Sequence, residues 1–382
     1  MRTLIVSDLH LGNRLGHDVL RRPGPRSTLL EALGDIDRLV LLGDTMELMS
    51  RHPWRAATAA EPVLRAIGRE LGGEREIILV PGNHDQPLVR AWALSQGASL
   101  QPDTTVDPAV TPALGRVVSW LAPARVRVHY PGVWLADGVW ATHGHYLDKH
   151  LLPESAFGVP RGWAPTLAAF GLPRGRPRAR RLAGAEPVVG AGAYELGRRR
   201  GRRSREPLVS RLMARPGATL LEAAGGVLRA ATVPAVPRLM MDVRLAPVTA
   251  WLIDLQMRHA SVPAIGRVAQ RIGVQADWIV FGHVHRRGPL PGEQWAAAPG
   301  GARMLNTGSW LYEPLLVDRA TPPHPYWPGG AVLLEPGRDP RSIGLLDDLS
   351  AGELTAPPPG VAGGAIGAGA RRPRRGPAGA SR

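Results

Sequence analysis

The sequence of 382 residues predicts an α/β sandwich, because strands and helices alternate along it. Over residues 1–150, apolar runs of about four residues alternate with segments of helical periodicity. Five apolar runs in the chain end in a turn that carries side chains able to bind hard metal ions. The same rhythm resumes at residue 262, so we expect one domain built from residues 1–150 and 262–350.

Local signals place several elements within this domain. Ser27 can cap a short helix that runs through Leu33, and residues 56–71 form a second helix of clear periodicity. Pro87 suits the first turn of a third helix. Asp137-Gly138 lies between two apolar runs, which predicts a β-hairpin.

Residues 151–261 break the rhythm and are expected to form an insert. Their first half is rich in Gly, Pro and Arg, which is typical of loops. Their second half is helical in pattern, because Trp251, Leu252 and Leu255 share one face. A further helix is expected to begin at Ser261 and to end at Gly273. Residues 351–382 are rich in Ala, Gly and Pro with several Arg, so we expect a disordered tail.

Composition excludes several classes of chemistry and location. The chain has no cysteine, which excludes disulfides, zinc–thiolate sites and cysteine nucleophiles. No stretch of about 18 apolar residues occurs without charge or proline, so we expect no transmembrane helix. Cleavage of a signal peptide would remove Asp8, a candidate ligand, and we therefore expect a cytoplasmic protein.

The net charge of +15 is concentrated in two segments. Residues 160–215 carry 14 Arg against 3 Glu, and residues 371–382 carry five Arg. Such segments bind nucleic acid, anionic lipid or acidic substrates, or they reflect only an Arg-rich composition, since Lys149 is the single lysine. No aromatic residue interleaves the Arg run at 198–203, which makes nucleic acid the weaker alternative.

The five turns bring together side chains that suit a metal centre. In chain order these side chains are Asp8, His10, Asp44, Asn83, His84, Asp85, His143, His145, His283 and His285. Ligands at the carboxyl ends of strands meet at one edge of a sheet. Oxygen and nitrogen ligands without sulfur suit Mn²⁺, with Fe or Zn²⁺ as alternatives. Two cations about 3.5–4 Å apart can clamp a phosphoryl group for in-line displacement, so the pattern predicts a two-metal hydrolytic centre.

The motifs resemble those of the calcineurin-like metallophosphoesterases, and the resemblance implies an αββα sandwich. Asp-x-His, Gly-Asp, Gly-Asn-His-Asp, Thr-His-Gly-His and Gly-His-x-His occur in the order of that family, over residues 1–150 and 262–335. For a first metal, the resemblance implies Asp8, His10, Asp44 and His285. For a second metal, it implies Asp44, Asn83, His143 and His283.

The same resemblance implies the catalytic residues. His84 matches the residue that contacts the phosphate and helps to protonate the leaving group, and Asp85 matches the residue that orients His84. Asp85 could also cap the helix near Pro87. Asn83, His84 and His145 are the expected substrate contacts, with a solvated loop position as the alternative for His145.

Within the superfamily, the chain is similar to the UDP-2,3-diacylglucosamine pyrophosphatase group at residues 8–11, 43–47 and 306–310. That group carries a helical lid over an acylated substrate in the interval that the insert occupies here. Two features differ, because the group has Arg where this chain has His84, and the insert is larger and Arg-rich. The resemblance implies hydrolysis of a phosphodiester or pyrophosphate bond in a phosphorylated small molecule or a lipid-linked nucleotide or sugar, with the insert near an anionic membrane surface.

Two other functions compete with this interpretation. The first is a soluble nucleotide phosphodiesterase or nuclease, which a steep salt dependence of nucleic-acid binding would reveal. The second is a non-catalytic scaffold, and the intact residues at all seven metal positions argue against it.

Overall fold

The computed structural model describes residues 1–50, 53–96, 100–145, 246–258, 262–295, 297–298 and 300–356. Ten strands in this part of the chain form one hydrogen-bonded path in the order β10-β9-β1-β2-β3-β5-β6-β7-β8, with β4 paired to β5. The strands are β1 (Thr3–Val6), β2 (Arg38–Leu41), β3 (Glu76–Leu79), β4 (Asp103–Val106), β5 (Arg125–Ala136), β6 (Val139–Thr142), β7 (Trp278–Phe281), β8 (Arg303–Asn306), β9 (Gly330–Leu334) and β10 (Arg341–Gly344).

The path folds into two facing sheets because β5 belongs to both. Its first residues pair in parallel with β3, and its last residues pair antiparallel with β6. A layer of apolar side chains fills the space between the sheets, with Ile5, Val40 and Ile78 on one side and Val133, Val280 and Leu305 on the other. Strands buried on both faces read as continuous apolar runs, which explains the pattern in the sequence.

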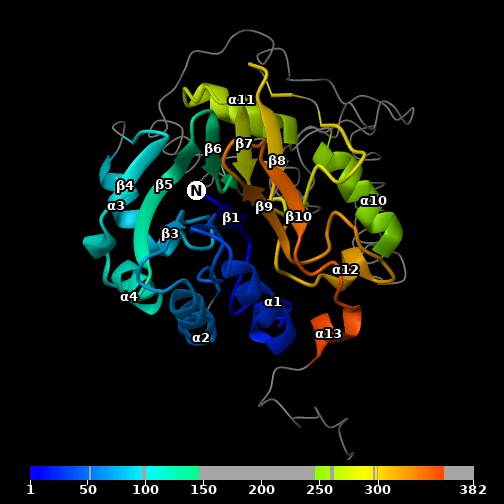
Figure 1. The fold of residues 1–382 in the computed structure, drawn as a ribbon, viewed down its shortest axis with the longest axis horizontal. Coiled ribbons are helices and arrows are strands. Elements are labelled where there is room, and N and C mark those ends of the chain that lie inside the picture. The colour runs from blue at the N-terminus through cyan, green and yellow to red at the C-terminus, as the bar shows by residue number, and fades with distance from the viewer. Residues whose placement is uncertain are drawn as a thin grey trace, which may run out of the picture.

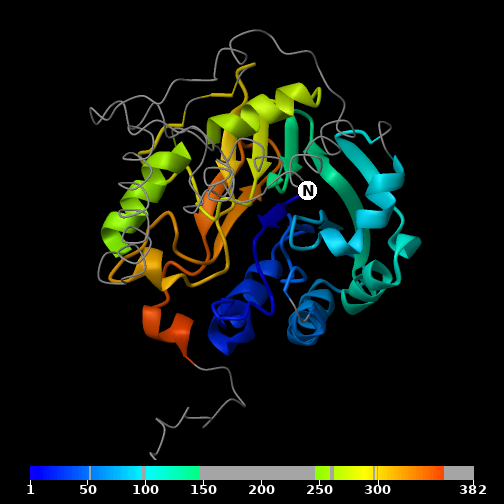
Figure 2. The same ribbon diagram turned by 180° about the vertical axis from the view of Figure 1, so that it is seen from behind.

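Helices cover the outer faces of both sheets (Figure 1). They are α1 (Pro23–Leu33), α2 (Pro53–Leu71), α3 (Arg90–Gln96), α4 (Pro112–Trp120), α10 (Ala246–Gln256), α11 (Val262–Arg271), α12 (Pro314–Val317) and α13 (Ala351–Thr355), with short 3-10 turns at Val19–Arg21, Gln86–Leu88 and Pro108–Val110. Ile265 and Val268 of α11 pack against the sheet that contains β7. Seen from behind, α1 and α2 lie below the opposite sheet (Figure 2). The predicted αββα sandwich is confirmed.

Several local predictions are confirmed and two need correction. Helix α2 covers the predicted 56–71, and the hairpin at Asp137-Gly138 joins β5 to β6. Ser27 does not cap α1, which begins at Pro23, and its hydroxyl donates to Glu31 Oε1 instead (2.9 Å). The fixed φ of Pro suits the first helical turn, where the missing N–H costs nothing.

The tail does not begin at residue 351 as expected. Helix α13 forms there because Ser350 and Glu353 make a reciprocal capping box, in which each side chain accepts a hydrogen bond from the backbone N–H of the other. Residues 151–245 of the expected insert, the Ser261 cap and the Arg-rich tail lie outside the described residues. No helix in the described part of the chain is long and apolar enough to cross a membrane.

Candidate metal centre

Backbone hydrogen bonds join the turns after β1 and β2 at one edge of the sandwich. The N–H of Asp8 donates to the carbonyl of Gly43 (2.9 Å), and the N–H of His10 donates to that of Asp44 (2.8 Å). Side-chain oxygens extend the connection, since Asp8 Oδ2 accepts from the N–H of His283 (2.9 Å) and Asp44 Oδ1 accepts from that of His84 (2.8 Å). Turns from both sheets therefore hold one another in place.

Backbone strain is concentrated at the predicted ligands. Six non-glycine residues in the described ranges have a positive φ, and the one outside this site is Arg319. The other five are Asp8 (54°), His10 (43°), Asp44 (50°), His283 (70°) and His285 (55°). Such a conformation costs about 1–3 kcal/mol per residue and persists where function requires it. The strain independently marks these five positions as a functional site.

Two motif glycines are required because other groups approach them closely. A Cβ atom on Gly43 would lie 2.4 Å from the His143 ring. A Cβ atom on Gly282 would lie 2.3 Å from Ser7 Oγ and 2.6 Å from Asp8 Oδ2. The glycine in each motif thus allows ligands from neighbouring strands to converge.

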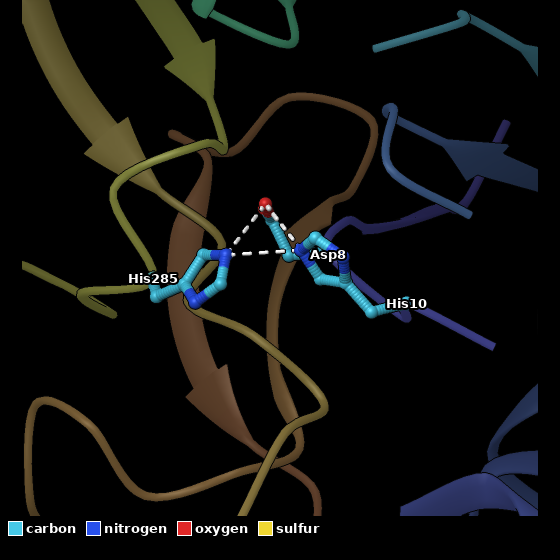
Figure 3. A group of neighbouring side chains, drawn as sticks. All are labelled: Asp8, His10 and His285. Atoms are coloured by element: carbon cyan, nitrogen blue, oxygen red, sulfur yellow. Dashed lines mark hydrogen bonds and ion pairs between the residues drawn. The ribbon is translucent and has the colours of Figure 1, made fainter. Parts of the chain in front are cut away.

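Asp8, His10 and His285 form the first cluster and point toward one another (Figure 3). His285 Nε2 lies 3.1 Å from His10 Nε2 and 3.2 Å from Asp8 Oδ1. His10 Nδ1 donates to Glu47 Oε2 (3.1 Å), which leaves a lone pair on Nε2. Asp8 Oδ1 is buried and accepts no hydrogen bond from the described part of the chain. Convergent lone pairs of this kind fit a divalent cation.

Asp44, His143 and His283 form the second cluster. His143 Nδ1 donates to the carbonyl of Leu42 (2.9 Å), so its Nε2 faces Asp44 Oδ2 and Asn83 Oδ1, each at 3.2 Å. Asp44 Oδ2 also lies 3.7 Å from His10 Nε2 in the first cluster. The structure thereby brings together the seven predicted metal positions, with Asp44 between the two groups.

Electrostatics keep the carboxylates ionised. Burial alone would raise the pKa of Asp8, but the positive charges of His143 and His285 lower it to about 2. The pKa of Asp44 is likewise well below its ordinary value, because His143 and His10 outweigh the effect of burial. Burial lowers the pKa of His143, and the charges of Asp44 and Asp8 raise it to about 10. This buried site therefore favours positive charge, as a cation site must.

The carboxylate that contacts His84 is Glu47, which corrects the role expected for Asp85. Glu47 Oε1 lies 2.6 Å from His84 Nδ1. The buried carboxylate of Asp85 instead accepts from the N–H groups of Thr45 and Met46, both at 2.9 Å. Burial and the charge of Asp44 raise the pKa of Asp85 to about 6. Asp85 therefore stabilises the turn after β2 through these hydrogen bonds. The spacing of residues in the sequence does not reveal which acid contacts His84.

His84 is placed as an acid beside both clusters. Its side chain is partly exposed, and its Nε2 lies 4.0 Å from Asp44 Oδ2. Burial lowers the pKa of His84, but the hydrogen bond to Glu47 and the charge of Asp44 raise it above the ordinary value. Atoms of His84, His10 and Asp44 also lie close enough to form a third group of metal-binding type. A protonated imidazole here can donate to a leaving oxygen.

His145 occupies a different place from the one expected. Its ring is fully buried, stacks on Tyr130 and lies beside His143, with centroids 6.0 and 5.8 Å away. Its Nε2 is 3.2 Å from the hydroxyl of Tyr130. His145 therefore packs against the predicted metal ligand His143 in the interior. It is neither the substrate contact nor the solvated loop residue that the sequence suggested.

The fold and the paired clusters define a metal-dependent hydrolase that acts on phosphoester bonds. Residues 1–168 match the family described as calcineurin-like phosphoesterase. The match contains the first four motifs, and the structure adds the fifth, at His283 and His285, to the same edge. No curated protein matches the chain.

Proposed function

We propose that this chain uses two divalent metal ions to hydrolyse a phosphodiester or pyrophosphate bond, with a lipid-linked nucleotide or sugar as substrate. The observation that carries the two-metal proposal is the position of Asp44, whose Oδ2 faces His143 Nε2 at 3.2 Å and His10 Nε2 at 3.7 Å. One carboxylate between two clusters of lone pairs suits a bridging ligand. The donor set favours Mn²⁺, with Fe or Zn²⁺ as alternatives.

The residues divide the chemistry between them. Bound divalent cations supply Lewis-acid polarisation of the phosphoryl oxygens and activation of water. Asn83 and His84 lie at the rim and orient the phosphate, and His84 gives its proton to the departing oxygen. Glu47 holds Nδ1 of His84, so that Nε2 is the atom that faces the reaction. The strained turns keep these groups in place before substrate arrives, which lowers the cost of organising the transition state.

The lipid-linked substrate is supported by the place of the Arg-rich insert in the sequence. The insert follows His143 and precedes His283, which are both proposed ligands of one metal. Arginine binds phosphate through its planar fork and is attracted to anionic lipid. We propose a cytoplasmic enzyme that works peripherally at an anionic membrane, with nucleic acid as the less favoured partner.

A substrate screen tests this function. The Mn²⁺-loaded protein is assayed against phosphomonoesters, phosphodiesters, nucleotide-sugar pyrophosphates and lipid pyrophosphates, with Asp44→Asn as the control. We expect turnover of diesters or pyrophosphates that Asp44→Asn loses, and the highest kcat/KM on acylated substrates. Turnover that persists in the control would contradict the dinuclear site, and a preference for soluble nucleotides would contradict the lipid substrate.

A further inference from the structure

A groove of about 420 Å³ lies between α2 and α4. The two helices are neighbours below the sheet that contains β2 and β3 (Figures 1 and 2). Its walls include Met46, Leu48, Trp54, Leu88, Val117 and Trp120. The volume falls within the range of ligand pockets, about 300–1,000 Å³.

The groove and the metal centre share two turns of the chain. Met46 and Leu48 flank Glu47, whose carboxylate contacts His10 and His84. Leu88 ends the short 3-10 turn Gln86–Leu88, which begins two residues after His84. Asp85 ties these two turns together through the backbone N–H of Met46 (2.9 Å). The groove is therefore lined in part by the two turns that also carry Glu47 and His84.

The lining selects a hydrocarbon chain. Among the described residues that line the groove, Arg116 has the one charged side chain, and Trp54 and Trp120 add only indole N–H donors. None of these described lining residues has a carboxylate, amide or hydroxyl side chain, so they offer no side-chain acceptor for the hydrogen bonds of a sugar or a base. Trp54, which lines the groove, is 61% exposed. Large apolar side chains that stay exposed near a site commonly contact a ligand.

We propose that the groove between α2 and α4 binds the hydrocarbon chain of the substrate whose phosphate lies at the metal centre. The inference rests on the proposed phosphohydrolase function and assigns a further part of the substrate to the core domain instead of the insert. Arg116 and Arg55 are exposed at this side, where they match a negatively charged head group.

A series of alkyl 4-nitrophenyl phosphodiesters tests the proposal, because the leaving group stays constant while the alkyl chain grows from methyl to hexyl to dodecyl. Each buried methylene contributes about 0.8 kcal/mol, so KM should fall by up to about fourfold per methylene until the groove is full. Ala113→Trp fills the groove from an exposed position of α4. We expect this variant to lose at least tenfold of the preference for dodecyl over methyl, with unchanged kcat and KM on the methyl ester.

Trp54→Ala should weaken the preference in the same direction, because it removes a wall. Trp251→Ala on α10 is the matched control, since it removes an indole that is 51% exposed and lies outside the lining. If Trp251→Ala abolishes the chain-length preference and Ala113→Trp leaves it intact, the chain binds at α10 and the proposal is wrong. A KM that is independent of chain length in the unmodified protein would also overturn it.

A second measurement does not depend on turnover. Dodecyl phosphate with a terminal diazirine is photolysed with the full-length protein, and the labelled peptides are identified by mass spectrometry. We expect labels within residues 53–57 and 112–120, reduced by Ala113→Trp, and labels confined to other residues would contradict the groove. Failure to hydrolyse any phosphoester would remove the proposed function while leaving this label map as a test of the groove itself.

Discussion

Glu47 connects the predicted metal ligand His10 to the predicted acid His84. Its Oε1 lies 2.6 Å from His84 Nδ1, and its Oε2 lies 3.1 Å from His10 Nδ1. Burial raises the pKa of Glu47, but the hydrogen bonds from both rings lower it to about 2. An ionised carboxylate accepts from both Nδ1 atoms, so a single side chain turns both Nε2 atoms toward the site.

Glu47→Gln should shift the pH profile of kcat/KM. The hydrogen bond to Glu47 raises the pKa of His84, and the protonated form is the acid, so activity falls as pH rises through that pKa. Loss of the carboxylate lowers the pKa, and the alkaline fall should begin at lower pH, with a rate loss of about 10–100-fold. The control is Glu61→Gln, which changes an exposed surface ion pair on α2. An unshifted alkaline limb would show that Glu47 does not tune His84.

His84→Ala should keep the metals and lose about 10²–10⁴-fold in rate, which is the usual contribution of acid–base assistance. The loss should be smaller for substrates with good leaving groups, because these need less protonation. Elemental analysis and paired kinetics on 4-nitrophenyl and alkyl esters check this. An emptied metal site would mean that His84 is a ligand, as its closeness to His10 and Asp44 also permits.

Asp44→Ala should remove at least one metal ion and nearly all turnover, because it deletes an oxygen that faces both clusters. Metal content per chain is measured after reconstitution with Mn²⁺ and desalting. Two ions per chain at a near-normal rate would refute a bridging role for Asp44.

Asp254→Asn should lower the free energy of unfolding by about 3 kcal/mol, because it removes one of the two carboxylates that pair with the buried guanidinium of Arg286. Arg286 is fully buried, and its guanidinium lies between Asp254 of α10 and Glu293, at 2.5 and 2.6 Å. Urea unfolding measures the change. Asp339→Asn is the control, since it breaks the exposed pair with Arg303 and should cost under about 1 kcal/mol. Equal effects of the two variants would contradict the importance of burial.

Replacement of residues 151–240 by a short Gly/Ser linker should separate the insert from the catalytic domain. The design keeps α10, and with it the contact of Asp254 with Arg286. We expect retained metal content and retained hydrolysis of a small chromogenic diester, with loss of binding to anionic liposomes and lower activity on acylated substrates. If the truncated protein hydrolyses small and acylated substrates at the same rates as the full chain, the insert is not a lid.

The sandwich and the edge at which the ligands meet could both be predicted from local sequence patterns. Apolar runs, Gly turns and helical periodicity are local properties of the backbone, so the strands before Asp8, Asp44 and His283 and the helix at 56–71 could be predicted without tertiary contacts. The ligand set followed because the carboxyl ends of parallel strands share one edge.

Which groups touch at that edge depends on how distant elements pack together. Glu47 and Asp85 are both acids within motif turns. Glu47 contacts His84 and Asp85 binds backbone N–H groups because of the way the two turns pack against each other, which the spacing of the residues in the sequence does not reveal. The burial of His145 behind His143 and the groove beside Leu88 likewise arise from elements far apart in the chain. Side-chain partners depend on ångström-scale packing between such elements, and periodicity along one strand or helix contains no information about that packing.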